Sequence, residues 1–521
     1  MNSSRSTGVA NGLIFIGVIA LLGALYWLFP AQIGGLGRAF WYSVPLKVIV
    51  IGFIISLALL VRGEGPFIVG LILTGLVAVG TGVGSHYHRA SQPYTSVDHV
   101  QGTQDTYRWR QPWVTAAAVA PSKAGAITGD FITEHTKYLP GVDAYSTPVV
   151  ARGIFSGYSE LVVQEHGKSV ATVCKFKEQT PRPGGPFHQS LSRAVARVSP
   201  MLKFEDRDTW AYCHKDGYAE LVVPVTKYKG FPEGHQVPAG IVVLDGVTVT
   251  HIANVEPGEY PGPVYPASIA AMQRASTVTA TGWWDMRLKR AGYETTSGGT
   301  STPSSSSGSD EATDQPDIAN PSEILLALEN NQGWDYVTPL VPRGASSSIV
   351  AVSSVAADQV TSGQFNDLEI RTLESPRLGN QALTLEIESQ FPQLNWRANG
   401  LGVVEVLPLS QGQWSATVAN RTTPMRQVNV DLDGTVCLTD IGGGNSTCDT
   451  PTNTDNDDNN DNHELDPPPA MDDEPQVQVP QSTELDGLTS EELIELQRHV
   501  NEEVARRFET AVNTTSKEDH R

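Results

Sequence analysis

The chain has 521 residues, a formal net charge of −21, and 18% charged residues. This length exceeds that of one ordinary domain, so several folded units are expected. The charge is uneven: residues 1–89 hold five basic residues and one acid, a balance of +4, so the remainder carries −25. An acidic chain of this kind disfavours nucleic acid and anionic lipid headgroups as partners.

Three apolar stretches near the N-terminus predict membrane-spanning helices, at residues 12–29, 44–61 and 66–84. Each is close to the roughly 20 residues that a helix needs to cross a bilayer core. A cleaved signal peptide is the alternative for the first stretch. Acids, histidines and mid-span arginines are absent from the three stretches, and the third is rich in glycine. This composition favours anchoring in the lipid bilayer and close helix packing over transport.

The predicted fold class is therefore a membrane protein, with a three-helix transmembrane bundle over residues 1–90. An N-terminus on the inner side leaves Arg5 and Arg62 in the cytoplasm and Arg38 and Arg89 outside, a slim majority under the positive-inside rule. Four cysteines in two local pairs fit an oxidising compartment. We expect a multi-pass protein of the plasma membrane with an extracytoplasmic C-terminal region.

Residues 91–295 are predicted to form an α+β extracytoplasmic domain. Strand-rich stretches with Gly-containing turns predict hairpins at 159–178, 208–228 and 236–253. Helices are expected near 187–198, between the first two hairpins, and at 266–292. Strand runs flanked by a few helices are typical of α+β architecture.

Two further units follow. Residues 296–318 are rich in Ser and Gly and predict a disordered linker. Residues 319–450 are predicted to be a small β-rich module, a sandwich or barrel, that opens with a helix at 321–331.

An acidic disordered linker is expected at 451–487. Its run at 455–466 is similar to a calcium loop, but Asn460 replaces the required glycine, so a solvated linker is the interpretation and no metal site is predicted. An amphipathic helix is expected at 488–513, before a tail at 514–521. Its apolar stripe, a candidate partner-binding surface, contains Leu493, Leu496, Val500, Val504 and Phe508.

The stretch "DLDGTV", which begins at Asp431, resembles the first motif of the haloacid-dehalogenase-type phosphatases. That family would use Asp431 as nucleophile and Asp433 as acid and base. The resemblance ends with this motif, because few folded residues follow it and the companion Ser or Thr, Lys and acidic pair are missing. Strand, turn and strand is the preferred interpretation.

The cysteines allow two interpretations. Cys437 and Cys448 are separated by a short Gly-rich segment, and Cys174 and Cys213 both lie on predicted hairpin strands, so two disulfides are candidates, with free buried thiols as the alternative. A Cys–His enzyme would instead use Cys213 with His214 and His188, if folding brought them together.

Two hypotheses follow. The preferred one is a non-enzymatic, membrane-anchored structural or interaction protein of a cell-envelope complex. It would present two extracytoplasmic modules and a tethered helix, with self-association or a protein partner at the transmembrane bundle and the C-terminal helix. The alternative is a cell-surface enzyme with the Cys–His site. Neither hypothesis needs a cofactor.

Overall fold

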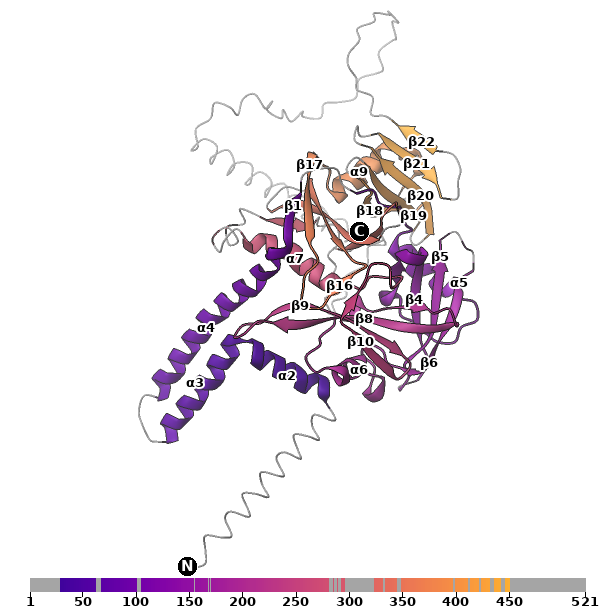
Figure 1. Ribbon diagram of the computed structural model, residues 1–521. Helices are drawn as coiled ribbons and strands as arrows, with labels where there is room; N and C mark the ends of the chain where they lie inside the picture. The colour runs from indigo at the N-terminus through magenta and orange to yellow at the C-terminus, as the bar shows by residue number, and fades with distance from the viewer. Residues whose placement is uncertain are drawn as a thin grey trace, which may run out of the picture. The chain divides into compact units, whose positions relative to one another are not determined.

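The computed structural model describes residues 29–449 with gaps (Figure 1). The gaps are 62–66, 101–104, 154, 167, 169, 281–283, 285–287, 289–291, 296–322, 331–332, 344–347, 397–398, 411–412, 421–422, 432–434 and 442–445. The predicted first span up to residue 28, both predicted linkers and the C-terminal helix therefore lie outside the described residues.

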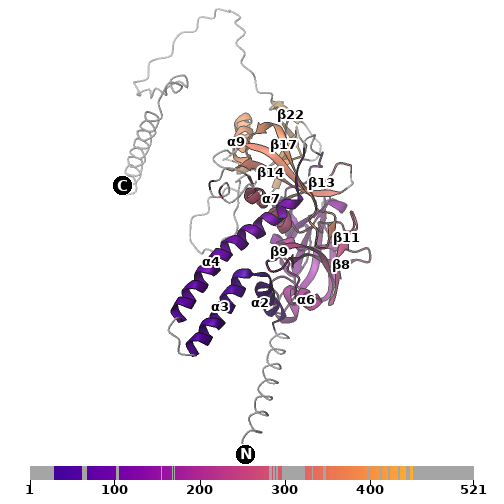
Figure 2. The same ribbon diagram turned by 60° about the vertical axis from the view of Figure 1, so that its left-hand side comes forward.

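Three helices stand at the start of the described chain. They are α2 (Pro30–Tyr42), α3 (Val44–Val61) and α4 (Phe67–Ser91). Figures 1 and 2 show α3 and α4 side by side, with α2 turned away from α3. The bend between α2 and α3 is 88°. No helix is predicted from sequence for residues 30–42, whose three glycines lower helix propensity.

The predicted three-helix transmembrane bundle is not confirmed. Among the described residues, one helix, Gly70–Ser96, is long and apolar enough to cross a membrane, and the bent pair of α2 and α3 adds at most a second. α3 itself has 18 residues. At about 1.5 Å per residue this is roughly 27 Å, slightly less than a bilayer core of about 30 Å. Multi-pass localisation is likewise not shown.

The largest sheet lies in the predicted α+β region. Its strands, in spatial order, are β10 (Thr248–Ile252), β9 (His235–Asp245), β8 (Tyr218–Lys229), β6 (Thr172–Thr180), β5 (Tyr158–Glu165), β4 (Ala144–Val150) and β2 (Asp130–Phe131), with β3 (Lys137–Leu139) on β4 and β7 (Trp210–Cys213) on β8. The three predicted hairpins are confirmed as β5–β6, β7–β8 and β9–β10. Their turns contain the Gly, Asp and Lys residues that mark tight connections.

A second sheet combines distant parts of the chain. Its order is β1 (Val97–Val100), β17 (Leu368–Arg377), β15 (Ile349–Ala356), β14 (Trp334–Pro342) and β12 (Tyr293–Thr295), with β13 (Ile324–Ala327) paired to β14. β1 runs parallel to β17, and the other pairs are antiparallel. The predicted helix at 321–331 is wrong, because its apolar run is the strand β13. All four β13 residues are buried, as in a strand covered on both faces.

The third sheet is an antiparallel meander of β18 (Leu401–Pro408), β19 (Trp414–Asn420), β20 (Thr423–Val430), β21 (Val436–Asp440) and β22 (Ser446–Asp449). Asp431 follows β20, and its N–H donates to the Thr435 carbonyl at 3.0 Å. β20 pairs antiparallel with β21, with Val430 opposite Val436, which confirms the two strands predicted around the phosphatase-like motif; residues 432–434 between them, Asp433 included, lie outside the described residues. A small ladder joins β11 (Asn254–Val255) to β16 (Val360–Thr361).

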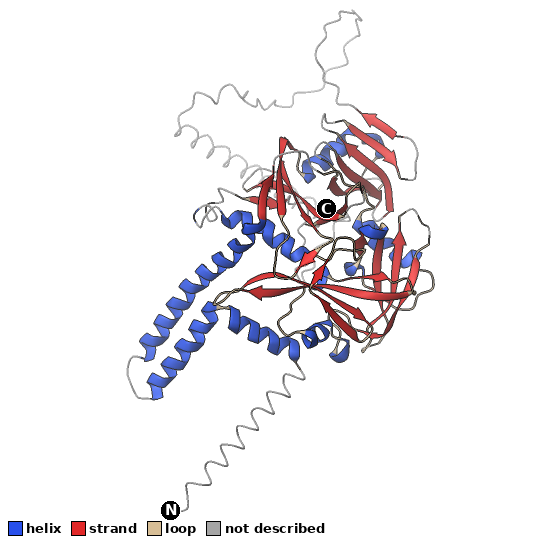
Figure 3. Cartoon of the chain, viewed as in Figure 1, coloured by secondary structure: helices blue, strands red, loops and turns tan. Residues whose placement is uncertain are grey.

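Besides the three helices at the start, further helices lie beside the sheets (Figure 3). The α-helices are α5 (Trp113–Lys123), α6 (Leu191–Val198), α7 (Ala267–Ala280) and α9 (Asn380–Gln390), and the 3-10 helices are η1 (Gln92–Ser96), η2 (Thr133–His135), η3 (Pro140–Val142), η4 (Phe187–Gln189), η5 (Asp206–Asp208) and η6 (Pro392–Leu394). The helix predicted near 187–198 is thus confirmed as η4 and α6. Of the helix predicted at 266–292, α7 confirms the first half.

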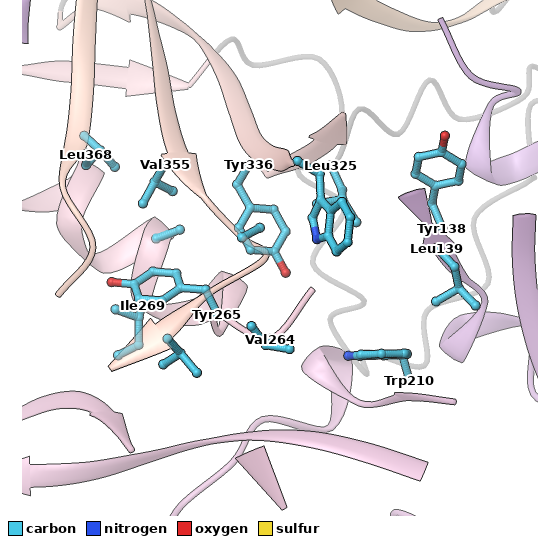
Figure 4. Packing of buried hydrophobic residues seen from close by; sticks show 14 of the residues in the cluster. Tyr138, Leu139, Trp210, Val264, Tyr265, Ile269, Leu325, Tyr336, Val355 and Leu368 are labelled. Atoms are coloured by element: carbon cyan, nitrogen blue, oxygen red, sulfur yellow. The ribbon is translucent and has the colours of Figure 1, made fainter. Parts of the chain in front are cut away.

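One hydrophobic core lies between the first two sheets. Figure 4 shows Leu325 and Tyr336 of the second sheet near Tyr265, Val264 and Trp210. These five side chains are all buried. Because aromatic side chains of this size bury much apolar area each, their packing joins the two sheets tightly.

Two disulfides cross-link pairs of strands. Cys174 of β6 bonds to Cys213 of β7, and Cys437 of β21 bonds to its directly paired residue Cys448 of β22. Both predicted disulfides are therefore present and the free-thiol alternative is excluded. Disulfides of this kind are typical of an oxidising, extracytoplasmic compartment.

Candidate functional site: the junction of the apolar helices with the sheets

The turn between β8 and β9 reaches the apolar helices. It reads "GFPEG" over residues 230–234 and contains a cis peptide bond before Pro232. Gly230 has φ of 104°, a conformation that side-chain-bearing residues rarely adopt. A Cβ atom on Gly234 would lie 2.5 Å from the ring of Tyr42, so only glycine permits α2 to end this close to the turn.

Glu233 is the centre of this junction. Its Oε2 accepts a hydrogen bond from the Val44 N–H at 2.9 Å and another from the Ser85 hydroxyl at 3.0 Å. Its carboxylate also pairs with the Arg89 guanidinium, and the Glu233 side chain is only 9% exposed. Val44 is the first residue of α3, so a carboxylate at this position satisfies an orphan N–H and complements the helix dipole.

The last carbonyl of α2 finds its hydrogen-bond donors at the same junction. The Tyr42 carbonyl accepts from the Arg89 guanidinium at 2.6 Å and from the Gly234 N–H at 3.2 Å. The Tyr42 ring stacks on Tyr228 of β8, with ring centroids 5.4 Å apart. One acidic turn therefore holds the end of α2, the start of α3 and the end of α4.

Arg38 makes a second attachment on α2. Its guanidinium donates to the carbonyls of Pro200 and Leu202, which follow α6. Arg38 and Arg89 are the two arginines that the sequence places on the outer side, against the positive-inside trend. Both guanidinium groups are bound by the folded part, Arg38 by the Pro200 and Leu202 carbonyls and Arg89 by the Glu233 carboxylate.

His235 follows the turn and stacks on Phe365, with ring centroids 6.2 Å apart. Burial lowers the pKa of this imidazole, and electrostatic interaction with Lys229 and with the His88 side chain lowers it further. A neutral His235 is therefore favoured beside the junction.

A second buried cluster joins all three sheets. Arg110 donates to the Leu325 carbonyl of β13 and contacts the Tyr145 hydroxyl of β4, and it forms an ion pair of 2.5 Å with Glu405 of β18. The Arg110 and Glu405 side chains are 4% and 3% exposed. Burial raises the pKa of Glu405 and lowers that of Arg110, but the Glu405 carboxylate reverses the latter shift, so the pKa of Arg110 is raised.

Glu405 also has an unusual backbone. Its φ is 53°, and a register shift between Val404 and Val406 leaves it without a partner in β19. A non-glycine residue in this left-handed conformation is strained, and such bulges re-aim a side chain. Here the bulge aims a carboxylate at Arg110.

The candidate residues of the Cys–His alternative lie on separate elements. The Cys213 sulfur is bonded to Cys174 and is not a thiol. His214 Nδ1 lies 3.0 Å from Asp216 Oδ1 in the β7–β8 turn, and His188 belongs to η4. The partner-binding candidates on the C-terminal stripe lie outside the described residues.

His86 and His88 lie on α4, where residues two apart point to different sides. Within the described ranges, no group of three or more His, Cys, Asp or Glu side chains is arranged to hold a metal ion.

Sequence reasoning missed both Glu233 and the Arg110–Glu405 pair. The signal for Glu233 is weak: a single acid in a Pro- and Gly-containing turn, among residues otherwise typical of an exposed connection. Glu405 offers a clearer signal, because it interrupts the apolar stretch "GVVEVLPL". A charged residue inside a buried strand needs a partner.

Comparison with known proteins adds no further assignment. No protein-family model matches this sequence, and neither a curated protein nor a solved structure is significantly similar to it.

Proposed function

We propose that this chain is a membrane-anchored structural or interaction protein of a cell envelope, which holds its disulfide-bonded sheets at the outer surface of the plasma membrane. The observation that carries the proposal is the Glu233 junction, which seats three apolar helices on the folded part. Many apolar side chains of α3 and α4 are exposed, including Ile54 and Leu76. A bilayer would cover such a surface.

The orientation follows from the ends that meet the sheets. The start of α3 and the end of α4 both contact Glu233, so the proposed anchoring puts the opposite ends of these two helices on the other side of the membrane. The two disulfides support an oxidising compartment for the sheets. Residues 62–66 are then cytoplasmic, which agrees with Arg62 under the positive-inside rule.

Thiol labelling tests this topology without background, because all four native cysteines are bonded. Ser122→Cys introduces a thiol at an exposed position of α5, and Glu64→Cys introduces one between α3 and α4. In intact cells, a membrane-impermeant maleimide is expected to label Ser122→Cys only. Glu64→Cys is expected to react after permeabilisation. Labelling of Glu64→Cys alone in intact cells would overturn the orientation, and release of the protein by alkaline carbonate would overturn anchoring.

The recruitment role rests on the apolar stripe predicted at 488–513. Leu496→Asp with Val500→Asp introduces two negative charges on the stripe, whereas Arg506→Asp changes the charge equally on the opposite side. We expect the double variant to lose co-purification of a differently tagged copy or of a partner protein, and the control to retain it. If both variants retain the same captured set, the helix has no recruitment role.

A further inference from the structure

Exposed apolar side chains gather on the folded side of the junction. Phe231 at the tip of the β8–β9 turn is 70% exposed, and its ring centroid lies 6.0 Å from that of Trp41, itself 53% exposed. Met201 is 44% exposed and lies between the two carbonyls that Arg38 binds. The β8–β9 turn, the end of α2 and the segment after α6 thus each expose an apolar side chain close to a contact with α2.

α2 presents an apolar face away from the sheets. At 100° per residue, Leu36 and Phe40 fall within about 40° of each other, and Phe29 precedes the helix as its N-cap residue. Arg38, which binds the chain after α6, lies on the opposite side. Leu36 is 71% exposed and Phe29 is 50% exposed. One face of α2 therefore contacts the folded part, and the other is uncovered and aromatic.

The direction of α2 indicates what covers this face. α2 meets α3 at 88°. If α3 crosses the bilayer, α2 lies nearly parallel to its surface, at the level where α3 begins. An amphipathic helix in this position buries its apolar face at the boundary between headgroups and acyl chains, and aromatic residues prefer that depth.

Lys47 of α3 contacts the same turn beside Phe231. Its ammonium donates to the Pro232 carbonyl at 2.8 Å and lies 4.6 Å from the centre of the Phe231 ring. A lysine in the first turn of a spanning helix extends its amine toward the headgroups.

We infer that the folded part itself inserts into the bilayer interface, through the apolar face of α2, Phe231 and Met201. This rests on the proposed membrane anchoring and adds a contact that anchoring by spans does not require. The partner is the lipid surface. Contacts of the folded part with lipid, in addition to the spanning helices, would fix the orientation of the sheets relative to the membrane.

Nitroxide labels on introduced cysteines measure this insertion in nanodiscs of phosphatidylcholine. Test positions are Leu36→Cys, Met201→Cys and Phe231→Cys, each made separately. Phe187→Cys, 68% exposed in η4, reports the aqueous side, and Leu73→Cys, 56% exposed on α4, reports the hydrocarbon. The observable is the ratio of collision rates with oxygen and with a water-soluble nickel chelate.

We expect the ratio at the three test positions to be several-fold higher than at Phe187 and lower than at Leu73. Ratios equal to that at Phe187, with a high ratio at Leu73, would overturn the insertion while leaving the anchor intact. An aqueous ratio at Leu73 would overturn both. Protection from both reagents with dipolar broadening between labels would assign the surface to a second copy of the chain and overturn the lipid contact.

Discussion

The buried pair of Arg110 and Glu405 offers the sharpest test of how the three sheets are held together. Arg110→Met removes the cation and leaves the Glu405 carboxylate buried without a counter-charge. Breaking a buried ion pair in this way costs about 3–5 kcal/mol. The Leu325 carbonyl also loses its donor, the Arg110 Nε at 2.9 Å. At roughly 2 °C per kcal/mol for a large domain, the melting temperature should fall by at least about 6 °C.

The double variant separates charge from packing. Arg110→Met with Glu405→Gln removes both charges but keeps an acceptor at position 405, so it should recover about 2 kcal/mol of the single variant's loss. The control is Arg426→Met, which breaks the exposed Arg426–Asp440 pair and should cost no more than about 1 kcal/mol. Melting is followed by tryptophan fluorescence. A loss below about 1 kcal/mol in Arg110→Met, or no recovery in the double variant, refutes this reasoning.

Three further outcomes are expected. Glu233→Ala should cost about 1–3 kcal/mol in chemical denaturation, because it removes three interactions at the junction, and Glu233→Gln should cost less; equal losses would contradict a role for the charge. Burial, with the nearby acids, raises the pKa of Asp335 from 3.8 to about 6, so the native state binds more protons between these values and loses stability as the pH rises through them. Asp335→Asn should therefore be more stable than the parent at pH 8 by at most about 3 kcal/mol and no more stable at pH 3.5, as urea titrations at both pH values will show. Replacing Cys174 and Cys213 by serine should lower the free energy of unfolding by about 4 kcal/mol, and replacing Cys437 and Cys448, which close a shorter loop, by about 3 kcal/mol. The reverse order of the two denaturation midpoints would contradict the chain-entropy account.

Local features were the predictable part of this fold. The three hairpins at 158–252 are predicted by period-two alternation and Gly-containing turns. Both disulfides were candidates, because the cysteines fall into two local pairs on predicted strands. The strand β13 was predicted as a helix because a strand buried on both faces has a continuous apolar run, which a short buried helix shares. Its antiparallel pairing with β14, the next strand along the chain, decided the outcome.

The junction was beyond local reasoning. Glu233 matters because of what lies opposite it, and Val44 and Arg89 are distant in the sequence. Similarly, α2 contains three glycines and gains its helical form by packing on the chain around α6. The period of the apolar residues and the composition describe one segment at a time, so they do not predict which turn contacts which helix. The first span and the C-terminal stripe stay predictions.

The parallel pairing of β1 with β17 bears on how the chain is made. β1 begins within a few residues of α4, yet its partner Leu368 follows Val97 by 271 residues. At about 5–20 residues per second, roughly 14–54 s separate the synthesis of the two strands. The short strand β1 therefore has no native partner while the residues between β1 and β17 are synthesised. During this interval the β1 edge lacks its native partner, and an unpaired strand edge is the kind of surface on which wrong pairing begins.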